Sequence, residues 1–389
     1  MGCDKIFMFK VKKHIMEKQK KILIFHPLIA PYRLDLFNDM AVKWNASIYL
    51  VFRKYWRFKN YDRDIRSKFK FTPQYIYPKG KEKGAGHFSF RYWKIIHKEN
   101  PDCILVWEFG TMTLLTILYK YLFGKKTKII TFCDDSPAML SQCTFKHKIA
   151  RNILSKFVDN IILASPVTLD WFNKKFNKGV YFPIIRDDEI ARKELYDEKI
   201  NEYSSFLANE FSLKQKNIFL FVGRLDPEKN VSTLLYAFSK ISNNEKDVLL
   251  IVGNGSKEQE YKYFINHNNI KNILLLGRKE GKELIAIYNL ADIFILPSFY
   301  EPFGAVTNEA LLFGCFSIVS NKAGSSSLIK NGQNGFTFSP DSENELCKLL
   351  INSKNKIKHT QNYMPKPNLM LDSYKNLFNK LTIALFNEK

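Results

Sequence analysis

The chain has 389 residues, of which 46% are hydrophobic, and its 60 Lys and Arg residues against 38 Asp and Glu give a formal net charge of +22. This length predicts two domains, each with its own core. No apolar run approaches the ~18 to 20 residues that span a bilayer, and no secretory signal follows the basic N-terminus, so we expect a cytoplasmic protein. The six cysteines lie without a pairwise motif, which predicts reduced thiols and argues against a zinc site.

Most of the excess positive charge lies in the first hundred residues, which hold 23 Lys and Arg against 8 Asp and Glu. An anionic membrane, a phosphorylated ligand or nucleic acid would each account for this charge, and so would a generally Lys-rich surface. Basic and aromatic residues alternate over residues 53–59 (RKYWRFK). This pattern favours a membrane surface, where Trp and Tyr lie at the headgroup level. We therefore expect peripheral association with an anionic membrane and no nucleic-acid partner.

After a basic extension at residues 1–19, the first half of the chain alternates apolar strands with helical patterns. Strands are predicted at residues 21–25, 46–52, 74–77, 103–108, 128–132 and 161–164, and helices at residues 91–99, 111–123 and 166–176. This alternation predicts an α/β fold with a parallel sheet. The loop after the first strand lacks the Gly-rich fingerprint of dinucleotide-binding proteins.

Polar side chains follow several of these strands. Glu108 ends one strand, and Asp134 and Asp135 follow the next. Ligands bind at the carboxyl ends of parallel strands, so catalytic or hydroxyl-binding acids are expected there, although the aspartates would equally suit a helix N-cap. His26 and Arg33 are candidates to face a ligand from the first loop, and a structural role is the commoner one for a histidine like His26. Adjacent aspartates are not the alternating pattern of metal-dependent sugar transferases, so no metal is predicted.

The second half begins after residues 187–215. This charged segment is predicted to be a linker that contains at most one helix. The second domain is predicted to start at Asn217, and strands are predicted at residues 218–223 (IFLFVG), 248–252, 273–276, 293–296 and 316–319. Small residues at strand ends, including Gly223 and Gly253, allow close backbone approach to a flat ligand such as a base. Arg224 and Lys229 precede a helix start, which suits a pyrophosphate, although solvated surface cations are the alternative.

Residues 291–320 (ADIFILPSFYEPFGAVTNEALLFGCFSIVS) predict a strand, a loop, a helix ended by Gly314, and a second strand. Glu301 lies in the loop and Glu309 inside the helix. If the helix starts near Gly304, Glu309 lies roughly 8 Å further along it, and the helix N-terminus suits a phosphate. A ligand with hydroxyls at both ends and phosphate between them, a nucleotide-sugar, fits this layout. The alternative is two solvated glutamates on an ordinary crossover.

Several short motifs occur in one order over residues 217–340: FVGRL at 221–225, EKN at 228–230, VGNG at 252–255, AD at 291–292, LPS at 296–298, EPFG at 301–304, NEA at 308–310 and NGQNGF at 331–336. This order resembles the GT4-type family of retaining GT-B glycosyltransferases. The N-terminal half is similar only in outline. Residues 27–33 resemble a subset of bacterial members that act on surface polysaccharides, but the Gly-Gly loop of many members is absent, so acceptor-side contacts are not carried over.

The resemblance implies a role for each matching residue. Arg224 and Lys229 match the cations that hold the donor diphosphate and stabilise the leaving nucleotide. Glu301 matches the first acid of the family's pair, which contacts the donor sugar, and Glu309 the second, on the ribose hydroxyls. Arg278 lies where the backbone brackets the base.

Further candidates complete this set. Backbone N–H groups near Phe303, Gly304 and Ala305 would face the sugar and phosphate. Gly223 and Gly253 are further donor-binding candidates, and Asp134 is a catalytic candidate from the N-terminal half.

The architecture implied is GT-B, with two Rossmann-like domains around a cleft. Its expected parts are an acceptor-side domain at residues 20–190, a linker at 191–216, a nucleotide-sugar domain at 217–366 and a C-terminal helix at 367–389 that crosses back to the first domain. The expected activity is a retaining hexosyl transfer, without metal or cofactor, from a nucleoside-diphosphate sugar to a saccharide or lipid-linked saccharide acceptor. The expected place is the cytoplasmic membrane face, in bacterial surface polysaccharide or glycoconjugate synthesis. A nucleotide-sugar epimerase, a phosphorylase and a basic nucleic-acid-binding protein are the alternatives.

Overall fold

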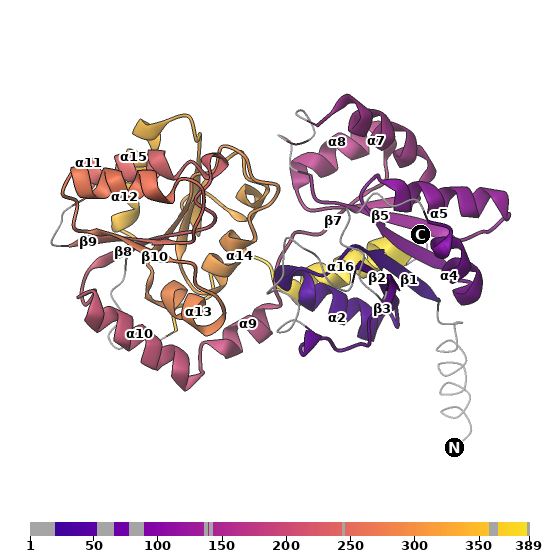
Figure 1. Ribbon diagram of the computed structural model, residues 1–389, viewed down its shortest axis with the longest axis horizontal. Coiled ribbons are helices and arrows are strands. Elements are labelled where there is room, and N and C mark those ends of the chain that lie inside the picture. Colours follow the sequence, from indigo (N-terminus) through magenta and orange to yellow (C-terminus); the bar gives the residue numbers. More distant parts are fainter. Residues whose placement is uncertain are drawn as a thin grey trace, which may run out of the picture. The chain divides into compact units, whose positions relative to one another are not determined.

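The computed structural model describes residues 20–52, 66–77, 89–135, 139, 143–242, 246–357 and 365–386 (Figure 1). The predicted extension at 1–19 and the aromatic and basic segment at 53–59 lie outside these ranges. The chain forms two compact units, one of Met1–Phe132 with Ile149–Ile161 and one of Cys133–Lys148 with Ile162–Lys389. None of the helices in the described part of the chain has the length and apolar character of a bilayer-spanning helix.

The first sheet has seven strands, and its order is β3-β2-β1-β4-β5-β6-β7. The pairs β1/β2, β1/β4, β2/β3 and β4/β5 are parallel. The strands are β1 (Ile22–His26), β2 (Ser47–Phe52), β3 (Gln74–Tyr77), β4 (Cys103–Trp107), β5 (Lys128–Cys133), β6 (Asn160–Leu163) and β7 (Gly179–Tyr181). The helices between them are η1 (Pro31–Arg33), α2 (Leu34–Lys43), α4 (Arg91–Glu99), α5 (Thr111–Leu122), α7 (Phe145–Phe157) and α8 (Pro166–Phe176). The predicted α/β class is confirmed.

The second sheet has six strands in the order β10-β9-β8-β11-β12-β13, and all five pairings are parallel. Its strands are β8 (Asn217–Val222), β9 (Asp247–Val252), β10 (Ile273–Gly277), β11 (Ile293–Leu296), β12 (Phe316–Ser320) and β13 (Gly335–Phe338). Its helices are η3 (Pro227–Lys229), α11 (Val231–Ile241), α12 (Glu258–His267), α13 (Gly281–Leu290), α14 (Ala305–Leu312), η4 (Gly324–Leu328) and α15 (Glu343–Lys354).

Helices cover both faces of this second sheet, because alternate strand residues point to opposite sides. Leu220 and Phe294 enter a core with residues of α13 and α14. Phe219 and Ile293 enter the core on the other face, with residues of α11, α12 and α15. Strands buried on both faces read as continuous apolar runs, which is how they appear in the sequence.

The strand order reverses between β8 and β11, since the chain first adds β9 and β10 on one side of β8 and then returns to add β11 on the other. Such a switch point leaves the loops that follow the two central strands free to bind a ligand at their carboxyl ends. The loop after β8 carries Arg224 and Lys229, and the loop after β11 carries Glu301.

The segment 187–215 differs from its prediction. It forms two helices, α9 (Asp188–Glu194) and α10 (Glu198–Glu210), rather than at most one. The carboxylates of Asp187 and Asp197 cap them by accepting hydrogen bonds from backbone N–H groups. Both helices send apolar residues into a core, among them Leu195, Ile200 and Leu207. The charges that indicated a linker are therefore caps and exposed faces of helices.

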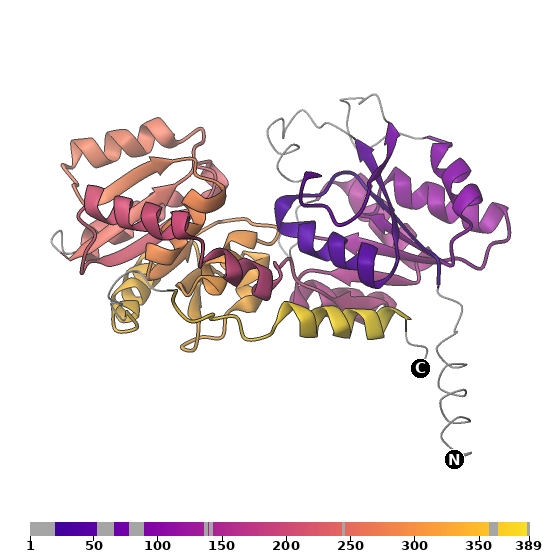
Figure 2. The same ribbon diagram turned by 90° about the horizontal axis from the view of Figure 1, so that it is seen from below.

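The last helix, α16 (Tyr374–Phe386), contacts β7 and is yellow in Figure 2. The ring of Tyr374 lies edge-on to that of Phe182, with centroids 6.1 Å apart, and its backbone N–H donates to Asp188 at 2.9 Å. Tyr374, Leu377, Phe378, Leu381 and Leu385 are buried, so the amphipathic pattern of this segment serves packing.

Gly253 lies where two strand-end loops touch. Its φ is +139°, and a Cβ placed on it would lie 1.8 Å from the carbonyl oxygen of Gly223. Its N–H donates to the carbonyl of Gly277 at 2.8 Å. Glycine is required here for both backbone conformation and space, so the ends of β8, β9 and β10 approach more closely than side chains would allow.

We expect Gly253→Ala to destabilise the protein by about 2–5 kcal/mol, through steric overlap and left-handed strain together. Gly277→Ala is the matched control, because Gly277 has a φ of +68° but open space around its Cβ position. It should cost only about 1–2 kcal/mol. Denaturant unfolding measures both changes. Equal losses in the free energy of unfolding would show that the close approach to Gly223 does not exclude a side chain at position 253.

Candidate functional site

The loop after β8 holds Lys229 in a fixed position. Lys229 ends the short helix η3, and Asn230 follows it in the left-handed conformation with a φ of 53°. The buried side-chain amide of Asn230 donates to the carbonyls of Pro297 and Pro340, each at 3.1 Å. Its oxygen accepts from Thr233 at 2.7 Å. The loop is thus anchored to the end of β11.

The loop after β11 is joined to its neighbours by backbone contacts. The N–H of Phe299 donates to the carbonyl of Glu228 at 3.0 Å, which links it to the loop after β8. Glu301 forms an isolated parallel bridge with Ala323, and its carbonyl accepts from Gly324 at 3.3 Å. These bonds fix the backbone from which the Glu301 side chain extends.

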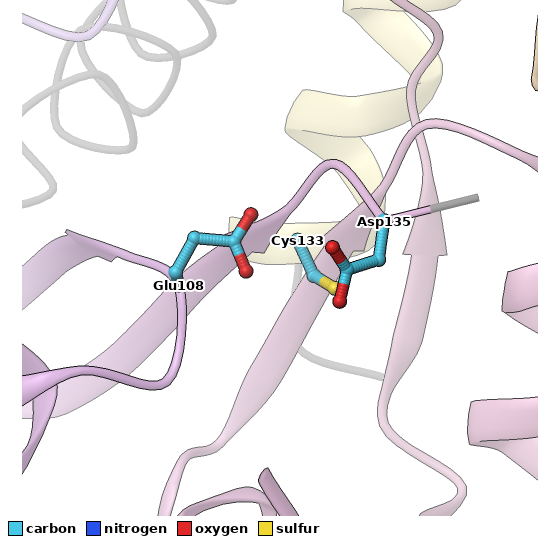
Figure 3. A group of neighbouring side chains, drawn as sticks. All are labelled: Glu108, Cys133 and Asp135. Carbon is cyan, nitrogen blue, oxygen red and sulfur yellow. The ribbon is translucent and has the colours of Figure 1, made fainter. Parts of the chain in front are cut away.

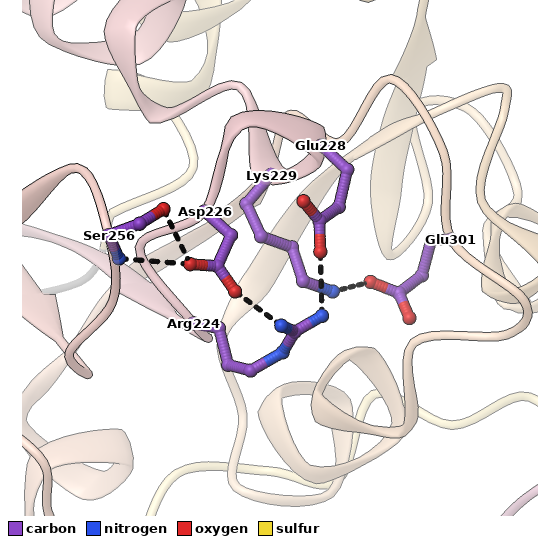
Figure 4. Close-up of polar contacts among 6 residues, drawn as sticks. All are labelled: Arg224, Asp226, Glu228, Lys229, Ser256 and Glu301. Atoms are coloured by element: carbon purple, nitrogen blue, oxygen red, sulfur yellow. Dashed lines mark hydrogen bonds and ion pairs between the residues drawn. The ribbon is translucent and has the colours of Figure 1, made fainter.

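Lys229 and Glu301, 72 residues apart in sequence, form an ion pair between the two loops (Figure 4). Each side chain is only 13% exposed. Partial burial strengthens their attraction, because water screens the two charges less than on an open surface. The structure therefore brings together two of the residues that the sequence predicts to be functional.

Arg224 lies beside this pair and is held by the carboxylates of Asp226 and of Glu228, the latter at 2.6 Å (Figure 4). Its side chain is 66% exposed, so these surface pairs hold it weakly. Asp226 also accepts from the backbone N–H and the hydroxyl of Ser256, at 3.0 and 2.9 Å. The backbone hydrogen bond from Ser256 is the main cause that lowers the pKa of Asp226, with further contributions from the Ser256 hydroxyl and the two cations.

The start of α14 lies directly after Glu301. Gly304 is its N-cap, with a φ of +91° that favours glycine, and a Cβ there would lie 2.8 Å from Leu296. Phe303 is buried, and Gly304 and Ala305 are partly exposed. The first N–H groups of a helix have no partner within it and carry the positive end of the helix dipole. An anion at this end would therefore be stabilised.

Glu309 lies on α14, facing α13. Its carboxylate accepts a hydrogen bond from the buried hydroxyl of Tyr288 at 3.3 Å. Burial raises the pKa of Glu309, and the positive charge of Arg186 partly offsets this shift. The Arg186 guanidinium is in turn bound to Glu194 at 2.9 Å. Glu309 is thus an acceptor held in place by a tyrosine and a nearby cation.

The remaining candidates of this unit lie at strand ends. Gly223 follows β8 and Gly253 follows β9, in the close contact described above. Arg278 follows β10, is exposed and pairs with Glu280, whose carboxylate accepts from its Nε at 2.9 Å. Among the described residues, the side-chain hydrogen bonds and the ion pair of Arg278 go to Glu280 rather than to Lys229 or Glu301.

In the first sheet, the ends of the neighbouring strands β4 and β5 bring together Glu108, Cys133 and Asp135 (Figure 3). One possible ligand atom from each lies within 4.8 Å of the other two. Cys133 is buried and the acids are half-buried, so this donor set mixes a soft thiol with hard carboxylates, and we assign no ion to it. Asp134, the catalytic candidate of this loop, is outside the group; its neighbour Asp135 is inside.

His26 at the end of β1 packs among aromatic rings. Its ring centroid lies 4.4 Å from that of Trp107 and 4.7 Å from that of Phe37. Burial lowers the pKa of His26 to about 3, and the charge of Arg33 adds to the shift. Arg33 is itself buried, with its guanidinium 5.7 Å from the centre of the Phe132 ring. His26 is therefore neutral and packs in the core, in line with the structural role that the sequence favours.

Several residues that shape the site were not singled out from the sequence. Asn230 was noted only as part of a motif, and an Asn directly before a predicted helix is the signal that would have indicated a left-handed turn or a cap at this position. Tyr288 and Arg186 gave no signal, because they lie 21 and 123 residues from Glu309 in sequence and only the fold brings them near.

Comparison with known proteins supports the resemblance. Residues 206–364 match the family described as glycosyl transferases group 1. The chain is 24% identical over 326 residues to the uncharacterized glycosyltransferase MJ1069 of Methanocaldococcus jannaschii, covering 76% of this chain and 80% of that protein. It is 33% identical over 159 residues to a Campylobacter jejuni enzyme, GalNAc-alpha-(1->4)-GalNAc-alpha-(1->3)-diNAcBac-PP-undecaprenol alpha-1,4-N-acetyl-D-galactosaminyltransferase, covering 39% of this chain and 44% of that one. The matches to several relatives thus span less than half of their length.

Solved structures share the fold. The crystal structure of Anabaena Alr3699/HepE in complex with UDP superposes with a TM-score of 0.66 at 16% sequence identity, over 94% of each chain. Together with the two parallel sheets, this similarity identifies the fold as GT-B.

We expect Glu309→Gln to stabilise the protein near neutral pH. The pKa of Glu309 in the folded state is raised above its ordinary value of 4.5, so the folded state binds this proton more tightly than the unfolded state. The contribution of Glu309 to stability is therefore greatest below pH 4.5 and falls as the pH rises through the raised pKa. Gln removes the titration and keeps an oxygen for Tyr288.

Denaturant midpoints of wild type and variant at about pH 7.5 and about pH 4.5 measure this effect. The increase in stability of Glu309→Gln over wild type should be present at the higher pH and vanish at the lower pH. The control variant Glu210→Gln, at an exposed glutamate, should show no such change. A variant less stable than wild type at the higher pH would mean that attraction to Arg186 outweighs burial.

Proposed function

Because the chain belongs to the group 1 glycosyltransferases, we propose that it transfers a sugar from a nucleoside-diphosphate sugar to a saccharide or lipid-linked saccharide. The transfer is proposed to retain the anomeric configuration, as in GT4-type members of the family. The observation that carries this proposal is the Lys229–Glu301 ion pair at the switch point of the second sheet. In this proposal the lysine binds the diphosphate, and the carboxylate beside it binds the sugar.

The chemical problem is the charge that develops on the leaving group. When the bond between the anomeric carbon and the phosphate oxygen breaks, negative charge builds up on the diphosphate. Lys229 is fixed by the Asn230 anchor, and Arg224 is exposed and weakly paired, so its guanidinium is able to exchange Glu228 for a phosphate. The N-terminus of α14 adds its dipole to these cations.

The two glutamates would bind the ends of the donor. Glu301 accepts hydrogen bonds from sugar hydroxyls, and its pairing with Lys229 sets the sugar next to the bond that breaks. Glu309, oriented by Tyr288, accepts from the ribose hydroxyls. Gly223 and Gly253 keep the strand ends open to a flat base, and Arg278 lies at the neighbouring strand end.

The transfer step is proposed as a front-face substitution. The acceptor oxygen bonds to the anomeric carbon on the face from which the phosphate leaves, and the acceptor proton passes to a phosphate oxygen. No protein nucleophile takes part in this scheme. The cations and the helix dipole supply the positive charge at the leaving group, so the proposed reaction requires neither a metal nor a cofactor.

The acceptor and the place of action are proposed from relatives. The Campylobacter jejuni relative is named for a saccharide carried on undecaprenol diphosphate. By analogy, the acceptor proposed here is a lipid-linked saccharide in bacterial surface polysaccharide or glycoconjugate synthesis, and the enzyme acts as a peripheral protein at the cytoplasmic membrane face.

Lys229→Gln and Glu301→Gln should separate binding from catalysis. Lys229→Gln removes the phosphate cation, so we expect weaker UDP binding and a kcat lower by about 10²–10³-fold. Glu301→Gln removes a carboxylate that competes for Lys229 without touching the nucleotide, so UDP affinity should stay within a few-fold or rise while kcat falls.

Calorimetric titration with UDP and turnover of UDP-sugars measure the two quantities. Lys214→Gln, at an exposed lysine after α10, is the matched control and should behave as wild type. If both site variants bind UDP as wild type does and keep its kcat, the ion pair is not part of a donor site. If UDP binds to none of the proteins, the same titrations with other nucleoside diphosphates identify the base first.

A further inference from the structure

Two helices of the first sheet combine basic and apolar residues without acids. In the sequence, α5 (TMTLLTILYKYL) and α7 (FKHKIARNILSKF) hold five Lys and Arg residues and no Asp or Glu. Of the five, Lys146, Lys148 and Lys156 are exposed, Arg151 is buried, and Lys120 pairs with Asp159. Two more lysines, Lys125 and Lys126, follow α5. A surface helix of a soluble protein ordinarily carries charged residues of both signs on its outer side, so this composition is unusual.

The outer side of these helices is also apolar. The exposed fractions are 37%, 60% and 66% for Leu118, Tyr121 and Leu122 of α5, and 42%, 50% and 41% for Ile149, Ile153 and Phe157 of α7. We call these six residues the α5/α7 surface. Within each helix they recur at steps of three and four residues, so they form one stripe along it.

The two stripes lie side by side. Strands β4, β5 and β6 follow one another in the sheet, so right-handed crossovers place α5 and α7 on the same face (Figure 1). The rings of Tyr121 and Phe157 meet at 5.9 Å between centroids, which joins the helices at their C-terminal ends. An exposed patch continues beyond them, because Phe123 contacts Trp93 and Trp93 contacts Phe90.

We propose that the α5/α7 surface docks the protein on an anionic lipid bilayer. The apolar side chains enter the boundary between headgroups and acyl chains, and the lysines remain at the level of the phosphates. Lys156 is exposed between Ile153 and Phe157 and is placed for this role. Lysines near a bilayer surface are attracted by anionic lipids, and apolar contiguous patches on otherwise soluble proteins mark interaction sites.

Charge favours a bilayer over a second copy of the chain. A two-fold dimer through the α5/α7 surface would bring basic helices against each other in a protein of net charge +22. A bilayer offers an apolar layer beneath a dense anionic one, which matches both properties of the surface. The inference rests on the proposed action at a membrane, but it concerns residues distant in sequence from the donor site.

Co-flotation of the full-length protein with vesicles tests the proposal. Vesicles of phosphatidylcholine with phosphatidylglycerol should bind the protein at low salt, and vesicles of phosphatidylcholine alone should bind it less. The double variant Ile153→Ser/Phe157→Ser should lower the partition of the protein onto the vesicles at least about tenfold, because two apolar side chains that enter the bilayer are lost. Lys156→Glu should lower it at least about fivefold, since the charge is reversed.

Matched controls are Tyr263→Ser, at an exposed aromatic residue of α12, and Lys214→Glu. Both should float as wild type does, circular dichroism should confirm that every variant is folded, and UDP titration follows the donor site. Three results would overturn the proposal: equal flotation of wild type and α5/α7 variants, no flotation of wild type, or a dimer in solution that the double variant abolishes. Since UDP binding is measured on the same samples, a failure of docking remains distinct from a failure of the donor site.

Discussion

The ion pair between Lys229 and Glu301 is the interaction on which the account of this protein depends. It joins two loops that follow the central strands β8 and β11, at the point where the strand order reverses. Ligands of parallel sheets with this topology bind at the carboxyl edge beside such a point, so the pair lies where a ligand is expected. Because both side chains are largely buried, losing either partner leaves a partly buried charge without compensation.

Contacts of neighbouring residues fix the two loops that carry this pair. The buried amide of Asn230 ties the lysine loop to the end of β11, and Gly304 allows α14 to begin directly after the glutamate loop. Gly253 lets the neighbouring strand end approach the backbone of Gly223. The cations, the helix N-terminus and the strand ends thereby converge at one edge of the second sheet. Glu309 follows 8 residues later, where the rigid helix α14 determines its position relative to Glu301.

Local patterns were sufficient to predict most of the fold. Strands 74–77 and 293–296 were predicted with their observed bounds, because turn residues flank short apolar runs, and Gly314 follows α14 in the left-handed conformation expected of a terminating glycine. The prediction of at most one helix in residues 187–215 was wrong. Capping residues and charged helix faces look like a linker in the sequence, because the core on which these helices pack cannot be read from it. The motifs predicted Lys229 and Glu301, but not Tyr288 beside Glu309 or the group around Cys133, which depend on contacts distant in sequence.

The most direct test of the account is the thermal stabilisation of wild-type protein by a panel of nucleoside diphosphates, UDP, GDP and dTDP, with the corresponding nucleosides beside them. If Lys229, Arg224 and the start of α14 bind the phosphates as proposed, one diphosphate should raise the melting temperature and its nucleoside should do so far less. Equal shifts with nucleoside and diphosphate, or no shift with any of them, would contradict the claim that the paired loops form a diphosphate site.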